Sequence, residues 1–467
     1  MTGWVLSVRH RYITELIYAS DNVGNGHWSR FHRFFSHHIW SLDAVGLTLT
    51  SLLINAFFPE GTIIPLALDD TLCRKRGLNL FGAGMHHDPL LSSKAVKLVS
   101  WGHCWVVLTV ILVGPAWAAS KVFSLPVAFR LYRNRQGNNK GKKKEQDTNS
   151  RTPTSTKKAK KAQAKKAKKA QARKAKKAAK KAPAQPTKRA KNTGKSSDHR
   201  TRPELGLELI NLITQAFPHR LFVVTADSLY GGESVLSKLP ANVHFISRVH
   251  PKGVLYAPPP LAIPGQRGRK RCKGERLSSI QDWANDNTPW TKLKFDQYGL
   301  HANLSVKTRD GLYYTAGKGR LLRFVLVRDN SGKRPLSIFY STLLDWAPKQ
   351  ILATYASRWS IEVAFENGKQ LLGFEDPANR LPKAVQRTAP MAMILVSLIT
   401  LWFHQKGHGH VKFPNRPWYS RKKEVSFGDM LSTIRRLSWQ EYFAGAASNQ
   451  GRLKKLITQI TEFVSRA

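Results

Sequence analysis

The chain has 467 residues and a formal net charge of +47 at pH 7. Its length allows two or more folded units, and so basic a composition excludes an ordinary cytosolic enzyme and indicates a polyanionic partner. Residues 133–202 supply about half of the basic excess, with 27 basic against 3 acidic residues, so the remaining sequence is strongly basic too. Nucleic-acid binding is therefore predicted for the body of the chain as well as for this segment.

Three cysteines, Cys73, Cys104 and Cys272, lie far apart without a CxxC pair. They predict reduced thiols rather than a disulfide framework or a zinc finger. The apolar runs 104–113 and 389–403 are shorter than the roughly 20 residues that span a bilayer, so they predict a buried strand and a core helix, with no membrane partner. The N-terminus lacks a signal-peptide pattern, and a cytoplasmic location is expected.

Residues 1–60 predict a helical N-terminal region with three helices, over 4–20, 27–37 and 41–58. Ser41 is the expected cap of the third helix. The middle helix mixes aromatic residues with arginine and histidine. Either a small DNA-binding unit or a basic helix that covers a core has this composition, and both interpretations stay open.

Residues 61–137 predict strands, over 62–68, 96–113 and 122–131, with a join in the second run at 101–103. The first strand ends in Asp69 and Asp70. Acids at the C-terminal end of a buried strand are typical of sites in α/β proteins.

Residues 138–202 form a low-complexity segment whose unit, 157–164, is repeated at 165–172 and approximately at 173–180. It contains too little apolar surface to offset its chain entropy, and its like charges repel, so we expect disorder. Its binding to DNA should be sensitive to salt and blind to sequence. The basic residues expected to make these nonspecific contacts are Lys157, Lys158, Lys160, Lys161, Lys165, Lys166, Lys168, Lys169, Arg173 and Lys174.

Residues 203–250 predict a further β-α-β step in which Asp227 directly follows a strand, with elements over 204–216, 220–225 and 243–249. Residues 251–345 predict a β-rich insertion with short strands, over 292–295, 302–307, 322–327 and 336–341. The basic run 267–273 at its edge is either a DNA contact or a solvated loop. Together these patterns predict an α/β fold with a mixed sheet flanked by helices.

Residues 346–380 contain a predicted helix on which Tyr355, Arg358, Glu362, Phe365 and Lys369 recur at spacings of three and four. These spacings place all five on one helical stripe. A carboxylate between cations and a phenol suits a metal ion beside a phosphate, although a surface helix with an Arg-Glu ion pair has the same pattern. Residues 381–467 predict a helical C-terminal region.

The three acids Asp70, Asp227 and Glu362 are the predicted catalytic and metal-binding residues. Two strand-end aspartates and a helix glutamate can hold two Mg²⁺ or Mn²⁺ ions, because these ions prefer oxygen ligands. In such a site one ion activates water or a DNA 3′-hydroxyl and the other stabilises the leaving oxygen. Asp69 is the alternative first acid, expected in a supporting role or on the other face of the strand.

The sequence resembles the bacterial insertion-sequence transposases with a DDE triad and a Tyr-Arg-Glu-Lys signature. The motifs that carry the resemblance are Tyr355-x2-Arg358-x3-Glu362-x6-Lys369, Asp69-Asp70-Thr71 and Ala226-Asp227-Ser228, together with the segments 81–88 and 373–380. The resemblance runs from about residue 4 to the end of the chain, without the Lys/Ala-rich segment, which interrupts a connection that the family keeps short.

This resemblance implies a ribonuclease H-like core, completed by the catalytic helix and interrupted by the β-rich insertion. Glu362 would be the third metal ligand, while Tyr355, Arg358 and Lys369 would grip DNA phosphates near the cleavage site. The expected activity is cleavage at the terminal inverted repeats of an insertion sequence and transfer of the 3′-hydroxyl ends to target DNA. A homodimer in a synaptic complex, acting in the bacterial cytoplasm on the nucleoid, is also implied.

Two other functions stay open. The Lys/Ala repeat is typical of a histone-like DNA-packaging protein, here attached to an inactive nuclease relic. A metal-dependent nuclease that cuts without strand transfer would carry the same three acids.

Overall fold

The structure is a computed structural model. It describes residues 1–8, 10–20, 26–93, 95–134, 199–250, 252–261, 269–297, 300–413, 417–418, 422–447 and isolated positions from 450 to 461. The chain divides into one unit of Met1–Asn134 with Arg200–Ala467 and another of Arg135–His199. The first unit carries every element described below. The predicted Lys/Ala-rich segment, with its ten nonspecific DNA-binding residues, lies outside the described residues except at its end.

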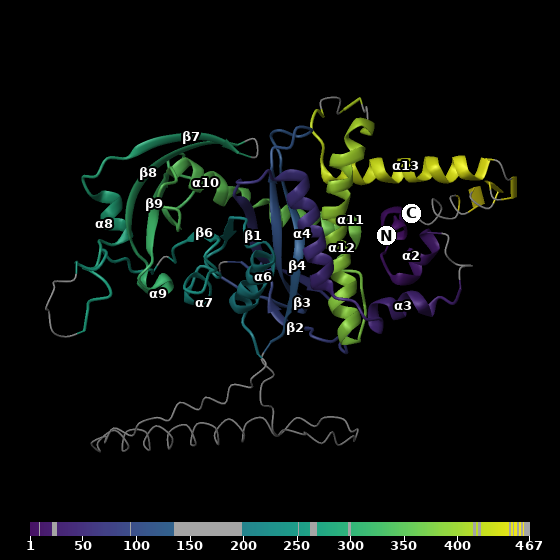
Figure 1. The fold of residues 1–467 in the computed structure, drawn as a ribbon, viewed down its shortest axis with the longest axis horizontal. Helices are drawn as coiled ribbons and strands as arrows, with labels where there is room; N and C mark the ends of the chain where they lie inside the picture. Colours follow the sequence, from purple (N-terminus) through teal and green to yellow (C-terminus); the bar gives the residue numbers. More distant parts are fainter. Residues whose placement is uncertain are drawn as a thin grey trace, which may run out of the picture. The chain divides into compact units, whose positions relative to one another are not determined.

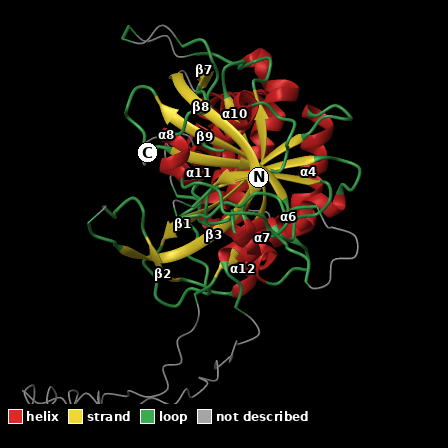
Figure 2. Ribbon diagram, turned by 90° about the vertical axis from the view of Figure 1, so that its left-hand side faces the viewer, coloured by secondary structure: helices red, strands yellow, loops and turns green. Residues whose placement is uncertain are grey.

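One large mixed sheet runs through the first unit (Figures 1 and 2). Its strands are β1 Ile64–Arg74, β2 Gly84–His87, β3 Val99–Val113, β4 Val122–Tyr132, β5 Phe222–Ala226, β6 Val243–Arg248, β7 Thr291–Gln297, β8 Leu300–Leu312, β9 Leu321–Asp329 and β10 Ser337–Ser341. The order is β2-β3-β1-β5-β6-β10-β9-β8-β7, and β4 also pairs with β3. The pairs β1–β5 and β5–β6 are parallel, and the remaining pairs are antiparallel. The predicted α/β fold with a mixed sheet and flanking helices is therefore confirmed.

Helices cover the sheet and form both terminal regions (Figure 1). They are α1 Thr2–Leu6, α2 Ile13–Ala19, α3 Ser29–Ser36, α4 Leu42–Phe57, α6 Arg202–Ala216, α7 Glu233–Leu236, α8 Ile280–Asn285, α9 Tyr314–Gly317, α10 Pro348–Ser357, α11 Ser360–Leu372, α12 Pro382–Trp402 and α13 Phe427–Ala447. After α12 come a π-helical turn, Phe403–Gly407, and a 3-10 turn, His408–His410. Helices α4, α11 and α12 all pack against β4, and α6 packs against β3 and β4.

Local capping explains where two of the predicted helices begin. Ser41 accepts a hydrogen bond from the Ala44 amide and caps α4, as predicted. Thr201 and Glu204 form a capping box at the start of α6, so the fold resumes directly after the basic segment.

The predicted N-terminal helix over 4–20 is wrong, because two helices, α1 and α2, take its place. Arg11 lies in the segment between these two helices. Its guanidinium donates to the carbonyl oxygens of Ser7 and Leu371, and its amide donates to Asp376. These contacts with the end of α11 replace the helical bonds that a continuous helix would make here.

Strand β1 is longer than the predicted strand over 62–68, and both Asp69 and Asp70 lie within it. Its parallel partner β5 ends at Ala226, opposite Leu68. Its antiparallel partner β3 continues past the acids and pairs Asp70 with Val106. The acids therefore lie where the parallel part of the sheet stops. The predicted join at 101–103 is also absent, since β3 is one strand.

The four strands predicted over 251–345 are present as β7, β8, β9 and β10. They extend the same sheet beyond β6, because β10 pairs with β6 through Tyr340 and Ser247. Figure 2 shows these strands fanning out with the others. The free edge of β6 is thereby covered by hydrogen-bonded backbone.

The predicted helix with five residues on one stripe is wrong in its continuity. Helix α10 ends at Ser357 and α11 begins at Ser360. Around Arg358 and Trp359 the amides bond three residues back, for example from Glu362 to the Trp359 carbonyl. Such 3-10 bonds tighten the chain between the two helices, yet Arg358 still lies on the same side as Glu362, four residues further on, with 3.8 Å between guanidinium and carboxylate.

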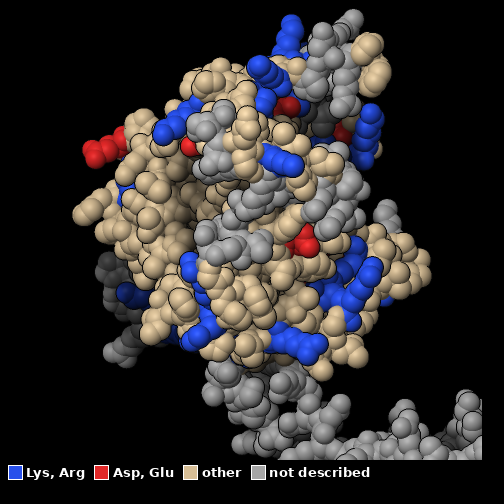
Figure 3. Space-filling model, turned by 90° about the vertical axis from the view of Figure 1, so that its right-hand side faces the viewer, with Lys and Arg blue, Asp and Glu red and all other residues tan. Residues whose placement is uncertain are grey.

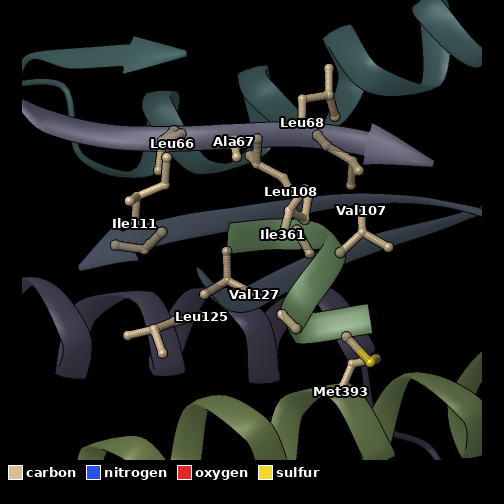
Figure 4. Close-up of a cluster of buried hydrophobic side chains, with 14 of the residues drawn as sticks. Leu66, Ala67, Leu68, Val107, Leu108, Ile111, Leu125, Val127, Ile361 and Met393 are labelled. Atoms are coloured by element: carbon tan, nitrogen blue, oxygen red, sulfur yellow. The ribbon is translucent and has the colours of Figure 1, made fainter. Parts of the chain in front are cut away.

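Helix α11 is seated on α12 by a close approach at Gly368. A Cβ atom at this position would lie 2.2 Å from the Met393 sulfur. Gly373, with φ of +68°, then ends α11 in the left-handed conformation. Figure 4 shows Ile361 of α11 and Met393 of α12 among the buried side chains of β1, β3 and β4. The site helix is thus fixed by the core.

Helix α12 is longer than the apolar run of the sequence predicts. With the two turns after it, the helical segment Pro382–His410 is the one helix among the described residues that is long and apolar enough to cross a membrane. Of its most apolar window, 83% is buried inside the protein, which is typical of a core helix. The prediction of a core helix in this region is therefore confirmed.

The folded unit carries basic side chains of its own. Figure 3 shows the face made by the terminal helices, where Lys and Arg side chains are spread around the rim and Asp and Glu appear at few places between them. The basic character predicted for the body of the chain is visible on this face.

Candidate active site

Glu362 lies in the first turn of α11, which begins directly after the 3-10 turn. Its side chain is 41% exposed, so its carboxylate reaches the surface. Partial burial raises the pKa of Glu362, and the positive charge of Arg358 opposes that rise. The neighbouring Trp359 is 54% exposed. The start of α11 therefore presents an acid and an aromatic ring to the solvent.

Arg358 connects this helix to the central strand. Its guanidinium donates a hydrogen bond to Asp69 and lies 3.8 Å from a carboxylate oxygen of Glu362. The Arg358 side chain is only 13% exposed. Its buried Nε has no hydrogen-bond partner among the described residues. Arg358 is therefore a buried cation between two of the acids, with one donor still available.

Asp69 is largely buried, with its side chain 16% exposed, beside three charged groups. Burial raises the pKa of Asp69 to about 7, Arg358 opposes this rise, and the charges of Asp227 and Asp70 add to it. Asp227 directly follows β5 and accepts a hydrogen bond of 2.9 Å from the Leu229 amide. Burial also raises the pKa of Asp227. Repulsion among these carboxylates and attraction to one arginine make them a single electrostatic cluster.

Asp70 has a different set of partners, because consecutive residues of a strand point to opposite faces. Its carboxylate accepts hydrogen bonds from Arg202 at 2.7 Å and from the Tyr230 hydroxyl at 2.9 Å. The Cys104 thiol donates to the same carboxylate at 3.5 Å. Tyr230 is fully buried. Asp70 is therefore bound by groups from α6, β3 and the turn after β5, away from Arg358.

Tyr355 lies at the end of α10, next to Arg358. Its ring stacks edge-on against Phe339 with 4.7 Å between ring centroids, and the Arg358 guanidinium carbon lies 5.7 Å from the Tyr355 centroid. Burial raises the pKa of the Tyr355 hydroxyl. The phenol is therefore neutral at physiological pH and can donate a hydrogen bond.

Lys369 lies near the other end of α11. Its ammonium donates to the Leu72 carbonyl at 2.7 Å and lies 3.4 Å from a carboxylate oxygen of Glu375. It connects α11 to the backbone of β1. Phe365 is buried, in agreement with a packing role for this residue.

The structure thus brings Asp69, Asp227 and Glu362 around Arg358, and it gives Asp70 and Lys369 other partners. Sequence reasoning overlooked Arg202 and Tyr230 as partners of an acid. Arg202 is the last residue of the basic segment, so its charge looked like part of that segment. Tyr230 follows Asp227 by three residues, and only the turn after β5 shows that its hydroxyl reaches β1.

The acids suit a divalent metal ion by their chemistry, since carboxylate oxygens are the ligands that Mg²⁺ and Mn²⁺ prefer. Within the described parts of the chain, however, no three His, Cys, Asp or Glu side chains are grouped closely enough to hold an ion. The guanidinium of Arg358 lies between Asp69 and Glu362 instead. A metal ion at these acids would therefore require this side chain to move.

Comparison with solved structures gives a piggyBac transposase in a synaptic complex with hairpin DNA, at 11% identity and a TM-score of 0.35. The match covers 82% of this chain and 57% of that one, so this chain spans little more than half of the transposase. A likeness at this level carries no argument about function. No curated protein matches the sequence.

The profile of a DDE superfamily endonuclease family matches residues 16–313. The matched region contains Asp69, Asp70 and Asp227 and ends before Glu362. It covers well over half of the chain, and it includes β1, which contains Asp69 and Asp70, and β5, which Asp227 follows. This chain therefore belongs to the DDE superfamily endonucleases.

Proposed function

We propose that this DDE superfamily endonuclease is a DNA transposase, which cleaves DNA at the ends of an insertion sequence and joins the 3′-hydroxyl ends to target DNA. The observation that carries the proposal is the arrangement of Asp69, Asp227 and Glu362 around Arg358, with Asp69 inside β1, Asp227 directly after β5 and Glu362 at the start of α11. Acids in this arrangement suit phosphodiester chemistry, because they can gather cations beside a phosphate.

The proposal includes a ribonuclease H-like core, which the strand pattern supports. The strands β4, β3 and β1 form an antiparallel set, and β1, β5 and β6 follow as a parallel set. The acids lie at the junction of the two sets, and α11 packs against β1 and β4.

For the first acid, the contacts favour Asp69 over the predicted Asp70. Asp69 shares Arg358 with Glu362, whereas both oxygens of Asp70 already accept hydrogen bonds from Arg202 and Tyr230, and the charge of Asp70 also acts on Asp227. Asp70 then has a positioning role, because it holds the start of α6 and the turn after Asp227 against β1.

Asp69, Asp227 and Glu362 are the residues that would hold two Mg²⁺ or Mn²⁺ ions. Such ions activate the attacking hydroxyl and stabilise the charge on the leaving oxygen. Glu362 is exposed enough to turn toward such an ion, and Arg358 would then be free to leave Asp69. Its guanidinium, with an unused Nε donor, would become available for a phosphate oxygen of the DNA.

Tyr355 and Trp359 complete the DNA contacts in this proposal. The neutral Tyr355 hydroxyl can donate to a phosphate oxygen, and the exposed Trp359 ring can stack on an unpaired base. For Lys369, the third predicted phosphate contact, the hydrogen bond to Leu72 favours a role in joining α11 to β1.

The partners in this proposal are the terminal inverted repeats and the target DNA, brought together by a homodimer in the bacterial cytoplasm. The Lys/Ala repeats, with Lys157 and Lys165 in corresponding positions, would add sequence-blind affinity for the nucleoid.

A plasmid that carries the coding region with its flanking DNA provides the test. Wild-type protein should nick this plasmid at the element ends with Mg²⁺ and should join pre-cleaved ends to a second DNA. The variants Asp227→Ala and Glu362→Ala should bind the ends without cutting them. Normal cleavage by both variants would contradict the proposal.

A nuclease without strand transfer is the second candidate, favoured by the endonuclease family to which the chain belongs. The same assay separates the two functions, because a nuclease cuts the plasmid and yields no joined product. A histone-like packaging protein, favoured by the Lys/Ala repeat, would lose all DNA binding when residues 138–198 are deleted. The transposase should keep its Mg²⁺-dependent cleavage in that deletion.

A further inference from the structure

A basic cleft opens where β6 ends and β10 begins. It has a volume of about 320 Å³, and the described residues that line it include the cations Arg248, Lys252 and Arg276 but no Asp or Glu. All three side chains are exposed. A concave surface with three cations and no acid concentrates positive potential at one place.

The walls of the cleft are ordered by hydrogen bonds and by the core. The Arg248 guanidinium donates to the Ser337 hydroxyl at 3.1 Å, and Arg309 donates to the hydroxyl and the carbonyl of Ser278 at 3.0 and 3.2 Å. Val249 and Ile338 are buried beneath it. The cleft therefore has a fixed apolar floor and a polar rim, as a binding site for an amphipathic ligand does.

A chain of side-chain contacts leads from this cleft to the acids. The Arg248 guanidinium carbon lies 5.8 Å from the centroid of the Phe339 ring, and Phe339 packs edge-on against Tyr355. Tyr355 in turn contacts Arg358, which is bound to Asp69. Arg248 both lines the cleft and contacts Phe339, so it connects the cleft to the residues beside Asp69.

We propose that this cleft binds the phosphate backbone of the DNA strand that is cut at Asp69, Asp227 and Glu362, an inference that rests on the proposed function. The strand passes Arg358 and Tyr355 and reaches Arg248, where three cations neutralise its phosphates. Its sugars lie over the apolar floor. Because these contacts involve the backbone, they hold the strand in register without selecting its sequence.

The test uses the full-length chain with Asp227→Ala, so that binding is measured without cleavage. The triple substitution Arg248→Gln, Lys252→Gln, Arg276→Gln removes the cations of the cleft. The matched control, Lys238→Gln, Lys333→Gln, Arg334→Gln, removes the same charge from exposed residues that do not line it. Affinity for a fluorescent single-stranded oligothymidylate is measured over a range of salt concentrations.

We expect the plot of log affinity against log salt to become less steep in the cleft variant, by about 0.7 for each lost phosphate contact. The slope of the control should differ from the wild-type slope by less than half of the change that one lost phosphate contact causes. In wild type, photo-crosslinked thymidine should be found on peptides within 248–256 or 276–281, and the cleft variant should lose these adducts. Equal slopes in the two variants, or no adduct on either peptide, would overturn the proposal and leave a solvated basic surface.

The result is separable from that of the proposed function. Loss of the adducts in the cleft variant supports the strand contact even if the wild-type chain fails to cut the plasmid. Conversely, the wild-type chain can cut and join DNA while the cleft variant and the control bind oligothymidylate equally well. The proposed function then stands, and the proposal that the cleft binds the strand is rejected.

Discussion

Asp69 and Asp70 are adjacent in β1, yet each is bound by a different arginine. Arg358, just before α11, donates to Asp69, and Arg202, at the start of α6, donates to Asp70. Both carboxylates are 16% exposed. The two acids therefore differ in the face of the strand on which each lies: Asp69 is bound by Arg358 beside α11, and Asp70 is bound by Arg202 at the start of α6.

The variants Asp69→Asn and Asp70→Asn should separate these roles. We expect Asp69→Asn to abolish Mn²⁺ binding, measured by titration calorimetry, and cleavage of the plasmid. Asp70→Asn should keep both at low temperature. It should lower the free energy of unfolding by about 1–3 kcal/mol, because it weakens hydrogen bonds from Arg202 and Tyr230 to a charged acceptor. Loss of Mn²⁺ binding in Asp70→Asn alone would restore Asp70 as the first acid.

Glu362 and Glu366 form a matched pair on α11. Glu362 lies 3.8 Å from Arg358, whereas Glu366 is exposed and hydrogen-bonded to Gln370. Glu362→Gln should reduce the rate of cleavage by at least about 100-fold, the typical cost of removing one group that stabilises the transition state. Glu366→Gln should cut at nearly the wild-type rate. Equal cleavage rates of the two variants in a single-turnover assay would mean that Glu362 is not a catalytic residue.

Much of this site can be predicted from the sequence, because strand ends and helical spacings are local patterns. The pattern after β5 correctly places Asp227 at a strand end, and that of α11 places Glu362 in a helix. The choice between Asp69 and Asp70 is different, since it depends on which helix covers which face of β1. That information lies in Arg358 and Arg202, which are far from β1 in the sequence.

Whether a helix runs on or is interrupted is also poorly predicted from the sequence where long-range contacts compete with local ones. The break before α2 depends on bonds between Arg11 and the end of α11. At the turn between α10 and α11, Arg358 bonds to Asp69 while it keeps its local contact with Glu362. In both cases a buried arginine bonds to a distant partner, and periodicity alone does not reveal that partner.

His103 should make stability depend on pH below neutrality. It is buried in β3, its Nε2 contacts the Phe81 carbonyl at 3.0 Å, and burial, with the charge of Lys75, lowers its pKa to about 4. The unfolded chain binds this proton near pH 6.5, so stability rises with pH between about 4 and 6.5 and is lost as the pH falls through that window. The loss is on the order of 3 kcal/mol at full protonation.

Chemical denaturation of wild type and His103→Gln at pH 4.5 and 7 measures this effect. The glutamine should keep a hydrogen bond to Phe81 and remove the contribution of His103 to the difference in stability between the two pH values, while the opposite contribution of Asp69 stays. Replacement of the exposed His250 by Gln should leave the wild-type dependence unchanged. An equal pH dependence in wild type and His103→Gln would mean that other groups account for it.

Gly368 is the position at which the packing of α11, the helix that carries Glu362, against α12 can be tested. A methyl group there would lie 2.2 Å from the Met393 sulfur, and Met393 is fully buried. Gly368→Ala should therefore push α11 away from α12 and lower the free energy of unfolding by about 1–3 kcal/mol, as overpacking of a core does. Because α11 carries Glu362, the variant should also cut DNA more slowly.

The double variant Gly368→Ala, Met393→Ala removes the clash and provides the control for Gly368→Ala. Cleavage should recover relative to Gly368→Ala alone, even though the smaller side chain at Met393 leaves a cavity that itself costs about 2–5 kcal/mol. Gly445→Ala in α13, where a methyl group meets no atom within 4 Å, should instead raise stability by about 0.5–1 kcal/mol through helix propensity. Recovery of activity without full recovery of stability would show that the position of α11, rather than the global stability of the chain, controls how Glu362 meets Arg358 and the two aspartates.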